Sequence, residues 1–187
     1  MMTHAVVRRM GRPALVAALA VGMLPGGVAP AAASTAALAT TAASATSATA
    51  YAPGTFGPFG YGGVKLGMSA KQARATRKIV PKTGWSQCTA WDLKAHPTGR
   101  DRVGLFISKR RGVAVIFAPK GVRTPQRIGL GSTERELKKA YPGLKRSASG
   151  YPYVTVPGNS KASYLFLLSR GRIYEMALTL KTQDCVN

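Results

Sequence analysis

The chain has 187 residues and a formal charge of +21, because 27 Lys and Arg residues outnumber six Asp and Glu residues. So few carboxylates, together with two histidines and two cysteines, argue against acid–base catalysis and against cation binding. The charge favours an anionic partner, although selection for solubility would give the same composition.

The first 33 residues have the pattern of an export signal. Three arginines precede an apolar run from 14 to 24, and small residues at 31–33 follow as a cleavage site. A second small-residue site at 48–50 leaves the point of cleavage open. The apolar run is shorter than the roughly 20 residues of a spanning helix. We therefore expect a signal peptide over 1–33 and a secreted or envelope-associated protein without stable membrane insertion.

Residues 34–59 are expected to form a disordered tether, because they are rich in Ala, Ser and Thr and then in Gly and Pro. The remaining residues, 60–187, suit a single domain. Three of the basic residues lie in the signal, so the exported chain has 27 − 3 = 24 basic and six acidic residues, a charge of 24 − 6 = +18. Outside the cell, nucleic acid is not the obvious ligand, although extracellular DNA is sometimes present beside phosphate-bearing wall polymers, acidic proteins and anionic lipid headgroups. The charge alone does not choose among these partners.

An internal repeat is the most informative feature of the domain. Residues 64–73 read VKLGMSAKQA, and residues 128–137 read IGLGSTEREL. In both, an apolar-x-apolar-Gly step leads to a hydroxyl residue that is followed three positions later by Gln or Glu, which is the capping-box pattern. We therefore expect Ser69 and Thr133 to begin equivalent helices.

Each repeat, 60–121 and 122–187, is expected to hold one helix followed by three strands. The helices are predicted over 70–80 and from Thr133 to near Tyr141, and the strands over 85–93, 102–108, 112–118, 151–156, 162–169 and 172–181. The predicted fold is α+β, with two tandem units that form one antiparallel sheet and carry their helices on one face. Trp85 and Trp91 are expected in the core beneath the helices.

Cys88 and Cys185 are expected to form a disulfide, because they are the only cysteines of an exported chain. A flat sheet in sequence order would separate its first and last strands by about 24 Å, whereas a disulfide needs Cα atoms within about 7 Å. Three arrangements allow the bridge: a sheet that curls shut, a tandem sheet of order 3-2-1-6-5-4, or a tail that folds back at Cys185. We favour the tandem sheet, which places strands 85–93 and 172–181 side by side.

The box at 67–73 and its echo at 131–137, with the strands after each, resemble the secreted β-lactamase inhibitory proteins. The same box also occurs in single-unit outer-membrane assembly lipoproteins of the BamE type. Over residues 60–187 the resemblance implies two tandem helix-plus-sheet units and inhibition of an enzyme by a sheet face or loop. The chain departs from the family in its cysteines, because those inhibitors close a disulfide within each unit.

The sequence gives little indication of a catalytic site or a metal site. His96, the only histidine after the signal, lies in a Pro-Gly loop that is typical of a solvated turn. A thiol dyad of Cys88 and His96 would need a reduced cysteine. A cation site from Asp92, His96 and Asp101 is disfavoured by the Lys and Arg residues between them. We therefore expect no catalytic residue, metal or cofactor.

The best candidate site is a pair of basic hairpin tips at equivalent positions in the two repeats. The tip residues are Lys109, Arg110, Arg111, Arg170 and Arg172. In the tandem sheet both tips leave the same edge, about 15 Å apart, where they could hold one extended polyanion. The alternative is that these hairpin tips are polar only because they are exposed to solvent.

The helices carry a second basic surface, which is more typical of a solvated face than of a ligand site. Its residues are Lys71, Arg74, Lys78, Arg135, Lys138 and Lys139.

These features predict a monomeric, secreted, non-catalytic binding protein whose basic surface engages an anionic polymer or an acidic protein. The alternative is a proteinaceous enzyme inhibitor of the β-lactamase inhibitory protein type. Its candidate contact residues are Tyr151, Tyr153 and Tyr164, because such interfaces concentrate aromatic residues. A hydrolase is the third possibility and has the fewest acid–base groups to support it.

Overall fold

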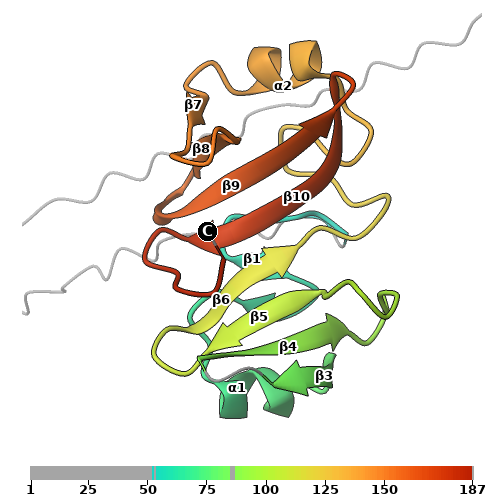
Figure 1. Ribbon diagram of the computed structural model, residues 1–187, viewed down its shortest axis with the longest axis vertical. Helices are drawn as coiled ribbons and strands as arrows, with labels where there is room; N and C mark the ends of the chain where they lie inside the picture. Colours follow the sequence, from blue (N-terminus) through green and yellow to red (C-terminus); the bar gives the residue numbers. More distant parts are fainter. Residues whose placement is uncertain (1–51, 53, 85–86, 187) are drawn as a thin grey trace, which may run out of the picture. The chain divides into compact units, whose positions relative to one another are not determined.

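The computed structural model describes residues 52, 54–84 and 87–186 (Figure 1). The predicted signal peptide, most of the predicted tether and Trp85 lie outside the described residues. The described part is an α+β fold with two helices, one eight-stranded sheet and one two-stranded sheet. Among the described residues, no helix is both long and apolar enough to cross a membrane.

The eight-stranded sheet has the order β3-β4-β5-β6-β10-β9-β8-β7, and every neighbouring pair is antiparallel. Its strands are β3 Ile79–Gly84, β4 Cys88–Leu93, β5 Leu105–Ser108, β6 Gly112–Phe117, β7 Lys145–Arg146, β8 Pro152–Val156, β9 Asn159–Ser169 and β10 Arg172–Leu180. The small sheet pairs β1 Gly60–Tyr61 with β2 Val64–Lys65, and the helices are α1 Ala70–Ala75 and α2 Glu134–Ala140. The centre of the large sheet is the pair of β6 and β10.

Both predicted capping boxes begin helices. In α1, Ser69 Oγ accepts from Gln72 N at 3.2 Å, and Gln72 Oε1 accepts from Ser69 N at 2.9 Å. In α2, Thr133 Oγ1 accepts from Glu136 N at 3.2 Å, and Glu136 Oε2 accepts from Thr133 N at 2.7 Å. The prediction for Ser69 and Thr133 is confirmed.

Each helix start is joined to the first residues of a central strand by the same pair of backbone hydrogen bonds. The bonds are Gly67 N to Val113 O (2.9 Å), Val113 N to Met68 O (2.8 Å), Gly131 N to Ile173 O (2.8 Å) and Ile173 N to Ser132 O (2.9 Å). Gly67 and Gly131 both have positive φ, 78° and 87°, which residues with a side chain rarely adopt. The sequence repeat therefore corresponds to a repeated local structure.

The helix predicted over 70–80 is shorter than expected, and the number of strands after it is larger. Helix α1 ends at Ala75, Arg77 has a φ of 57°, and the edge strand β3 begins at Ile79. An edge strand tolerates Pro81, whereas a central strand would not. Four strands rather than three follow α1, and the two-residue β7 gives α2 four strands as well. The prediction of three strands per helix is wrong.

The favoured strand order is also wrong. Strand β10 pairs with β6, and β4 lies two strands beyond β6. The predicted disulfide is present, with a Cα–Cα distance of 5.8 Å between Cys88 and Cys185. It forms because the tail after Leu180 folds back across the sheet, which is the third of the arrangements that allow the bridge. This route needs no contact between the first and last strands.

The two faces of the sheet differ in their apolar clusters. The main core includes Trp91 of β4 and the buried residues of both helices, Ala73 and Leu137. Cys88 has the opposite parity to Trp91 in β4 and therefore points to the other face, called here the outer face. The outer-face cluster consists of Ala114, Val115 and Ala177, packed by Phe106, Phe117, Cys185 and Val186.

The folded part begins earlier than predicted. Phe56 is fully buried in the main core, and its backbone N donates to Arg123 O at 2.8 Å. The predicted tether boundary at residue 59 is therefore wrong, because the burial of one aromatic side chain draws the preceding segment into the fold.

Candidate anion-binding surface

The first predicted tip joins β5 to β6 and carries the three cations at 109–111. Ser108 Oγ accepts hydrogen bonds from the backbone N–H groups of Arg110 and Arg111, both at 3.1 Å. Gly112 ends the turn with a φ of 70°, and a Cβ atom there would lie 2.5 Å from Met68 O. The side chains at 109–111 are all exposed. The tip is thus a tight turn that packs on the segment before α1 and points its cations into solvent.

One of these cations lies near a carboxylate of the tail. The Ser108 and Gln87 side chains hold the pKa of Asp184 below its usual value, and the charge of Arg111 adds to this effect. The distance from Gln87 Nε2 to Asp184 Oδ2 is 3.2 Å. Within the described residues, the side chains of Lys109 and Arg110 make no hydrogen bond or ion pair.

The second predicted tip joins β9 to β10. Its two central residues, Arg170 and Gly171, both have positive φ, 51° and 72°, as in a type I′ turn. Arg172 Nη1 donates to Gly131 O at 2.9 Å. The pKa of Glu136 is held below its usual value by hydrogen bonds from the N-cap residue of α2, and the charge of Arg172 contributes further. Arg172 therefore supports the start of α2, and Arg170 is the cation that projects freely.

The two tips leave opposite ends of the sheet, so the predicted shared edge is wrong. Strand β6 begins at the first tip, its antiparallel neighbour β10 begins at the second, and Val115 lies opposite Thr179. Four residues of β6 and eight of β10 separate the tips, roughly 40 Å at about 3.4 Å per residue. Figure 1 shows the β5–β6 connection at the lower left and the β9–β10 connection at the upper right. The expected spacing of about 15 Å does not hold.

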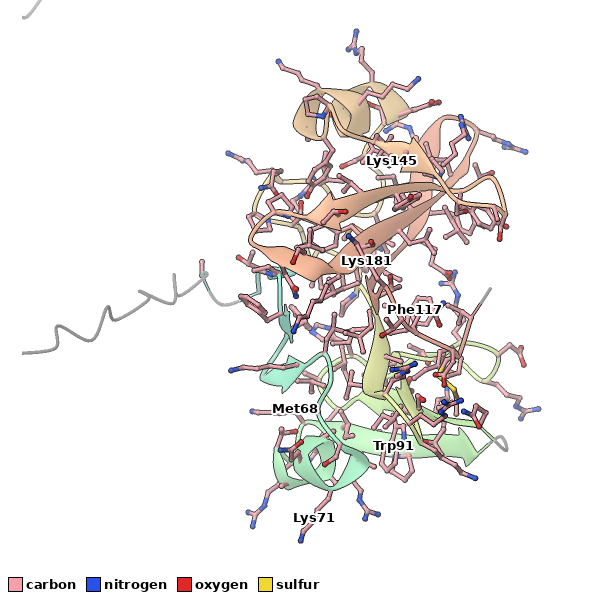
Figure 2. The ribbon with its side chains drawn as sticks, turned by 90° about the vertical axis from the view of Figure 1, so that its left-hand side faces the viewer. Met68, Lys71, Trp91, Phe117, Lys145 and Lys181 are labelled. Atoms are coloured by element: carbon pink, nitrogen blue, oxygen red, sulfur yellow. A yellow bond between two sulfur atoms is a disulfide. The ribbon has the colours of Figure 1, made fainter. Side chains whose placement is uncertain are left out.

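The cations of the helical segments form two groups rather than one surface. All six are exposed, and Lys78 lies beyond the end of α1. Lys138 Nζ pairs with Glu134 Oε1 at 2.8 Å, one helical turn away. The helices lie at opposite ends of the sheet (Figure 1), and Lys71 projects from the end occupied by α1 (Figure 2).

Most of the positive charge is not neutralised within the described part of the chain. All 24 basic residues after position 33 are described there, and only five of their side chains form a hydrogen bond or ion pair. The five are Lys82, Arg123, Lys138, Arg146 and Arg172. Four of the six carboxylates make such contacts: Asp92, Glu134, Glu136 and Asp184. The remaining 24 − 5 = 19 basic side chains make no hydrogen bond or ion pair with the described residues.

An ion pair between the partly buried Lys82 and the buried Asp92 closes the loop between β4 and β5. Lys82 Nζ lies 3.4 Å from Asp92 Oδ2 and also donates to backbone carbonyls of residues 98–102. Asp92 accepts from Thr98 N at 2.9 Å, Thr98 Oγ1 at 2.6 Å and Gly104 N at 3.0 Å. Burial raises the pKa of Asp92, but the hydrogen bonds from Thr98 and the charge of Lys82 outweigh it and lower the pKa. Asp92 is therefore a structural acceptor.

His96 is more enclosed than a solvated turn residue. Its side chain is half-buried, Tyr61 OH lies 3.0 Å from His96 Nε2, and the two ring centroids are 5.7 Å apart. That part of the prediction is wrong, because the β1–β2 hairpin packs on the loop that holds His96. The thiol dyad is not formed, since Cys88 is bound to Cys185.

The cation site considered for Asp92, His96 and Asp101 is not assembled among the described residues. The group found there with ligand atoms within 4.8 Å of one another is Cys88, Asp184 and Cys185. Both sulfurs of that group belong to the disulfide and are not thiolates.

The three candidate tyrosines have different surroundings. Tyr164 is buried in the main core and donates to Phe56 O at 2.7 Å, so it is not a contact residue. Tyr151 is 38% exposed, Tyr153 is half-buried, and both line a cavity with Arg146 and Lys181. The proximity of these two cations to one cavity was not predictable, because residues 35 positions apart carry no local signal of it.

Comparison of the chain with protein-family models, with curated proteins and with solved structures finds no match in any of the three. The resemblance to the secreted β-lactamase inhibitory proteins therefore stays a prediction. The function has to be argued from the charge and geometry of the molecule itself.

Proposed function

We propose that this is a secreted, non-catalytic binding protein whose basic surface engages an anionic partner outside the cell or at its envelope. The observation that carries the proposal is the set of 19 basic side chains without a hydrogen bond or ion pair among the described residues. Such charges hold mobile counterions, and a polyanion that replaces those ions gains free energy from their release. The disulfide supports export, because disulfides persist in oxidising compartments.

The positions of the cations favour an extended partner. Lys109 and Arg110 at one end of the sheet, and Arg170 at the other, are the leading contact residues. Arg111 and Arg172 are secondary, because each lies near a carboxylate. A compact anion cannot reach both tips across roughly 40 Å, whereas a linear polymer can.

We infer further that the chain is a fused pair of equivalent units. Each capping-box helix is followed by four strands, and the last strands of the two units, β6 and β10, pair antiparallel at the centre of the sheet. A two-fold rotation about an axis through this pair would exchange the units, their helix starts and their basic tips. A polymer of repeating anionic groups could then bind both ends of one molecule, and the two contacts would reinforce each other.

The test compares two variants that remove the same charge from different places. The tip variant carries Lys109→Gln, Arg110→Gln, Arg111→Gln, Arg170→Gln and Arg172→Gln. The control variant carries Lys71→Gln, Arg74→Gln, Lys78→Gln, Arg135→Gln and Lys139→Gln. Both are titrated into fluorescein-labelled polyphosphate at low salt, and binding is followed by fluorescence anisotropy.

The tip variant should bind at least tenfold more weakly than wild type, and the control variant less than threefold. Equal losses in both variants would show that the tips are not a site and that only net charge matters. A wild-type protein that does not bind polyphosphate at low salt would overturn the proposed function.

Two exposed aromatic residues favour a second candidate, the enzyme inhibitor that the family resemblance implies. Tyr151 and Tyr174 are 38% and 46% exposed, and aromatic side chains of this kind anchor protein interfaces. Affinity capture from culture fluid would recover one enzyme in stoichiometric amount if this candidate is correct. Recovery of wall material alone would count against it.

A further inference from the structure

A cavity of about 370 Å³ opens on the outer face beside β8, β9 and β10. Leu165 of β9 lies in its floor, alternates with core residues Tyr164 and Phe166, and pairs with Ala177 of the outer-face cluster. The loop at 146–151 forms one wall, and the C-terminal tail forms another.

The tail wall is held in place at both ends. Gln183 N donates to Leu180 O at 3.1 Å, and Gln183 Oε1 accepts from Cys185 N and Val186 N, both at 2.9 Å. The disulfide to Cys88 then ties Cys185 to β4. Lys181, which follows β10 directly (Figure 2), and Val186 thus form part of a wall with a defined position.

The lining combines apolar surface with positive charge. Leu165, Val186 and the rings of Tyr151 and Tyr153 supply the apolar part, and Arg146 and Lys181 supply the charge. Among the described residues, no Asp or Glu side chain lines the cavity. Arg146 Nη1 donates to Gly150 O at 2.9 Å, which orients its guanidinium in the loop. Among the described residues, the Lys181 ammonium and the hydroxyls of Tyr151 and Tyr153 have no hydrogen-bond partner. Two cations and two tyrosine hydroxyls therefore surround a partly apolar cavity, which Ser, Thr and Gln side chains also line.

We propose that this cavity is a binding site for a small amphiphilic anion. The aromatic or aliphatic body of the ligand lies against the tyrosine rings and Leu165, and its carboxylate, sulfonate or phosphate lies at Lys181 and Arg146. The volume of about 370 Å³ is in the range of small-molecule sites and suits a ligand of two or three rings. The site includes none of the hairpin-tip residues, so it does not depend on the proposed function.

The test uses 8-anilinonaphthalene-1-sulfonate, an aromatic anion whose fluorescence rises in an apolar site. Wild-type protein, Lys181→Gln and Lys94→Gln are titrated with it under native conditions. Lys94 is the matched control, because it is exposed, carries the same charge and lies outside the cavity. N-phenyl-1-naphthylamine, which has the same rings without the sulfonate, separates the apolar contribution from the ionic one.

Wild type should bind one sulfonate probe per chain with saturation, Lys181→Gln should weaken binding at least fivefold, and Lys94→Gln should change it less than twofold. Binding of the neutral probe should be insensitive to Lys181→Gln. Phenyl phosphate and benzoate should displace the sulfonate probe, whereas phenol should not. Equal effects of the two lysine variants, or binding without saturation, would overturn the proposal and leave the tip experiment unaffected.

Discussion

Removal of the disulfide should cost the protein a large part of its stability. Cys88 and Cys185 are 97 positions apart, so the bridge closes a loop of 97 + 1 = 98 residues in the unfolded chain. The loop-entropy relation gives about 2.1 + 1.5R ln 98, or roughly 16 cal/mol/K, which is about 4.7 kcal/mol at 25 °C. Domains of this size are stable by only about 5–15 kcal/mol. We therefore expect Cys88→Ala combined with Cys185→Ala to lower the free energy of unfolding by about 4–5 kcal/mol.

The effect should be visible by both urea and thermal unfolding. Trp91 is buried in the main core and reports on tertiary structure by fluorescence. An unfolding entropy of about 2.1 cal/mol/K per residue over about 130 residues converts the loss into a drop in Tm of roughly 17 °C. The m-value should rise, because the unfolded state without the bridge exposes more surface. Wild type treated with reductant should behave like the double variant. A loss below about 1 kcal/mol with an unchanged m-value would refute the reasoning.

Three further predictions concern stability. Asp92 has a lowered pKa in the folded state, so its ionised carboxylate stabilises the fold. This contribution to the free energy of unfolding is complete above the ordinary carboxyl pKa of about 3.9, and it is lost as the pH falls through the lower pKa of the folded state. The stability difference between wild type and Asp92→Asn in urea should therefore shrink between about pH 6 and about pH 2, and a constant difference would argue against this role. Gly112→Ala should lower the free energy of unfolding by about 2–4 kcal/mol, because the new Cβ would lie 2.5 Å from Met68 O. The control Gly121→Ala, where the new Cβ has open space around it, should lower it by only about 1–2 kcal/mol in the same assay. Phe56→Ala should lower the free energy of unfolding by about 3–5 kcal/mol, because its side chain is fully buried. Phe59→Ala, at a side chain that is 55% exposed, should lower it by less than about 1 kcal/mol. Equal Tm values for the two variants would show that Phe56 is not a core residue.

The features that were predictable depend on residues close together in the chain. A capping box is complete within four residues, so Ser69 and Thr133 could be identified as helix starts from their own neighbours. The disulfide was predictable because the sequence pattern predicts export and a chain with two cysteines has only one intramolecular pairing.

The strand order was not predictable from such local patterns. The pairing of Val115 with Thr179 joins residues 179 − 115 = 64 positions apart, and several strands offered equally apolar partners. Strand β3 was missed because Pro81 usually ends an element, whereas here it lies in an edge strand. The wrong order then placed both hairpin tips at one edge of the sheet.

In the candidate sites too, features set by neighbouring residues were predictable, and features set by long-range strand pairing were not. Exposure of the tip cations follows from their place in short turns, so it was predictable. The distance between the two tips was not predictable, because it depends on the register between β6 and β10. The outer-face cavity is lined by Arg146 and Lys181 together with residues of the folded-back tail, and no sequence spacing indicates that these residues line one cavity.

The salt dependence of wild-type binding to polyphosphate tests the central claim most directly. Three leading tip cations that each replace one counterion should give a slope of log K against log[salt] of about −2 or steeper, at roughly 0.7–0.9 per contact. Affinity should then fall at least tenfold between about 50 and about 200 mM salt. A flat dependence, or no binding at the lower salt concentration, would contradict the claim that the basic surface engages an anionic partner.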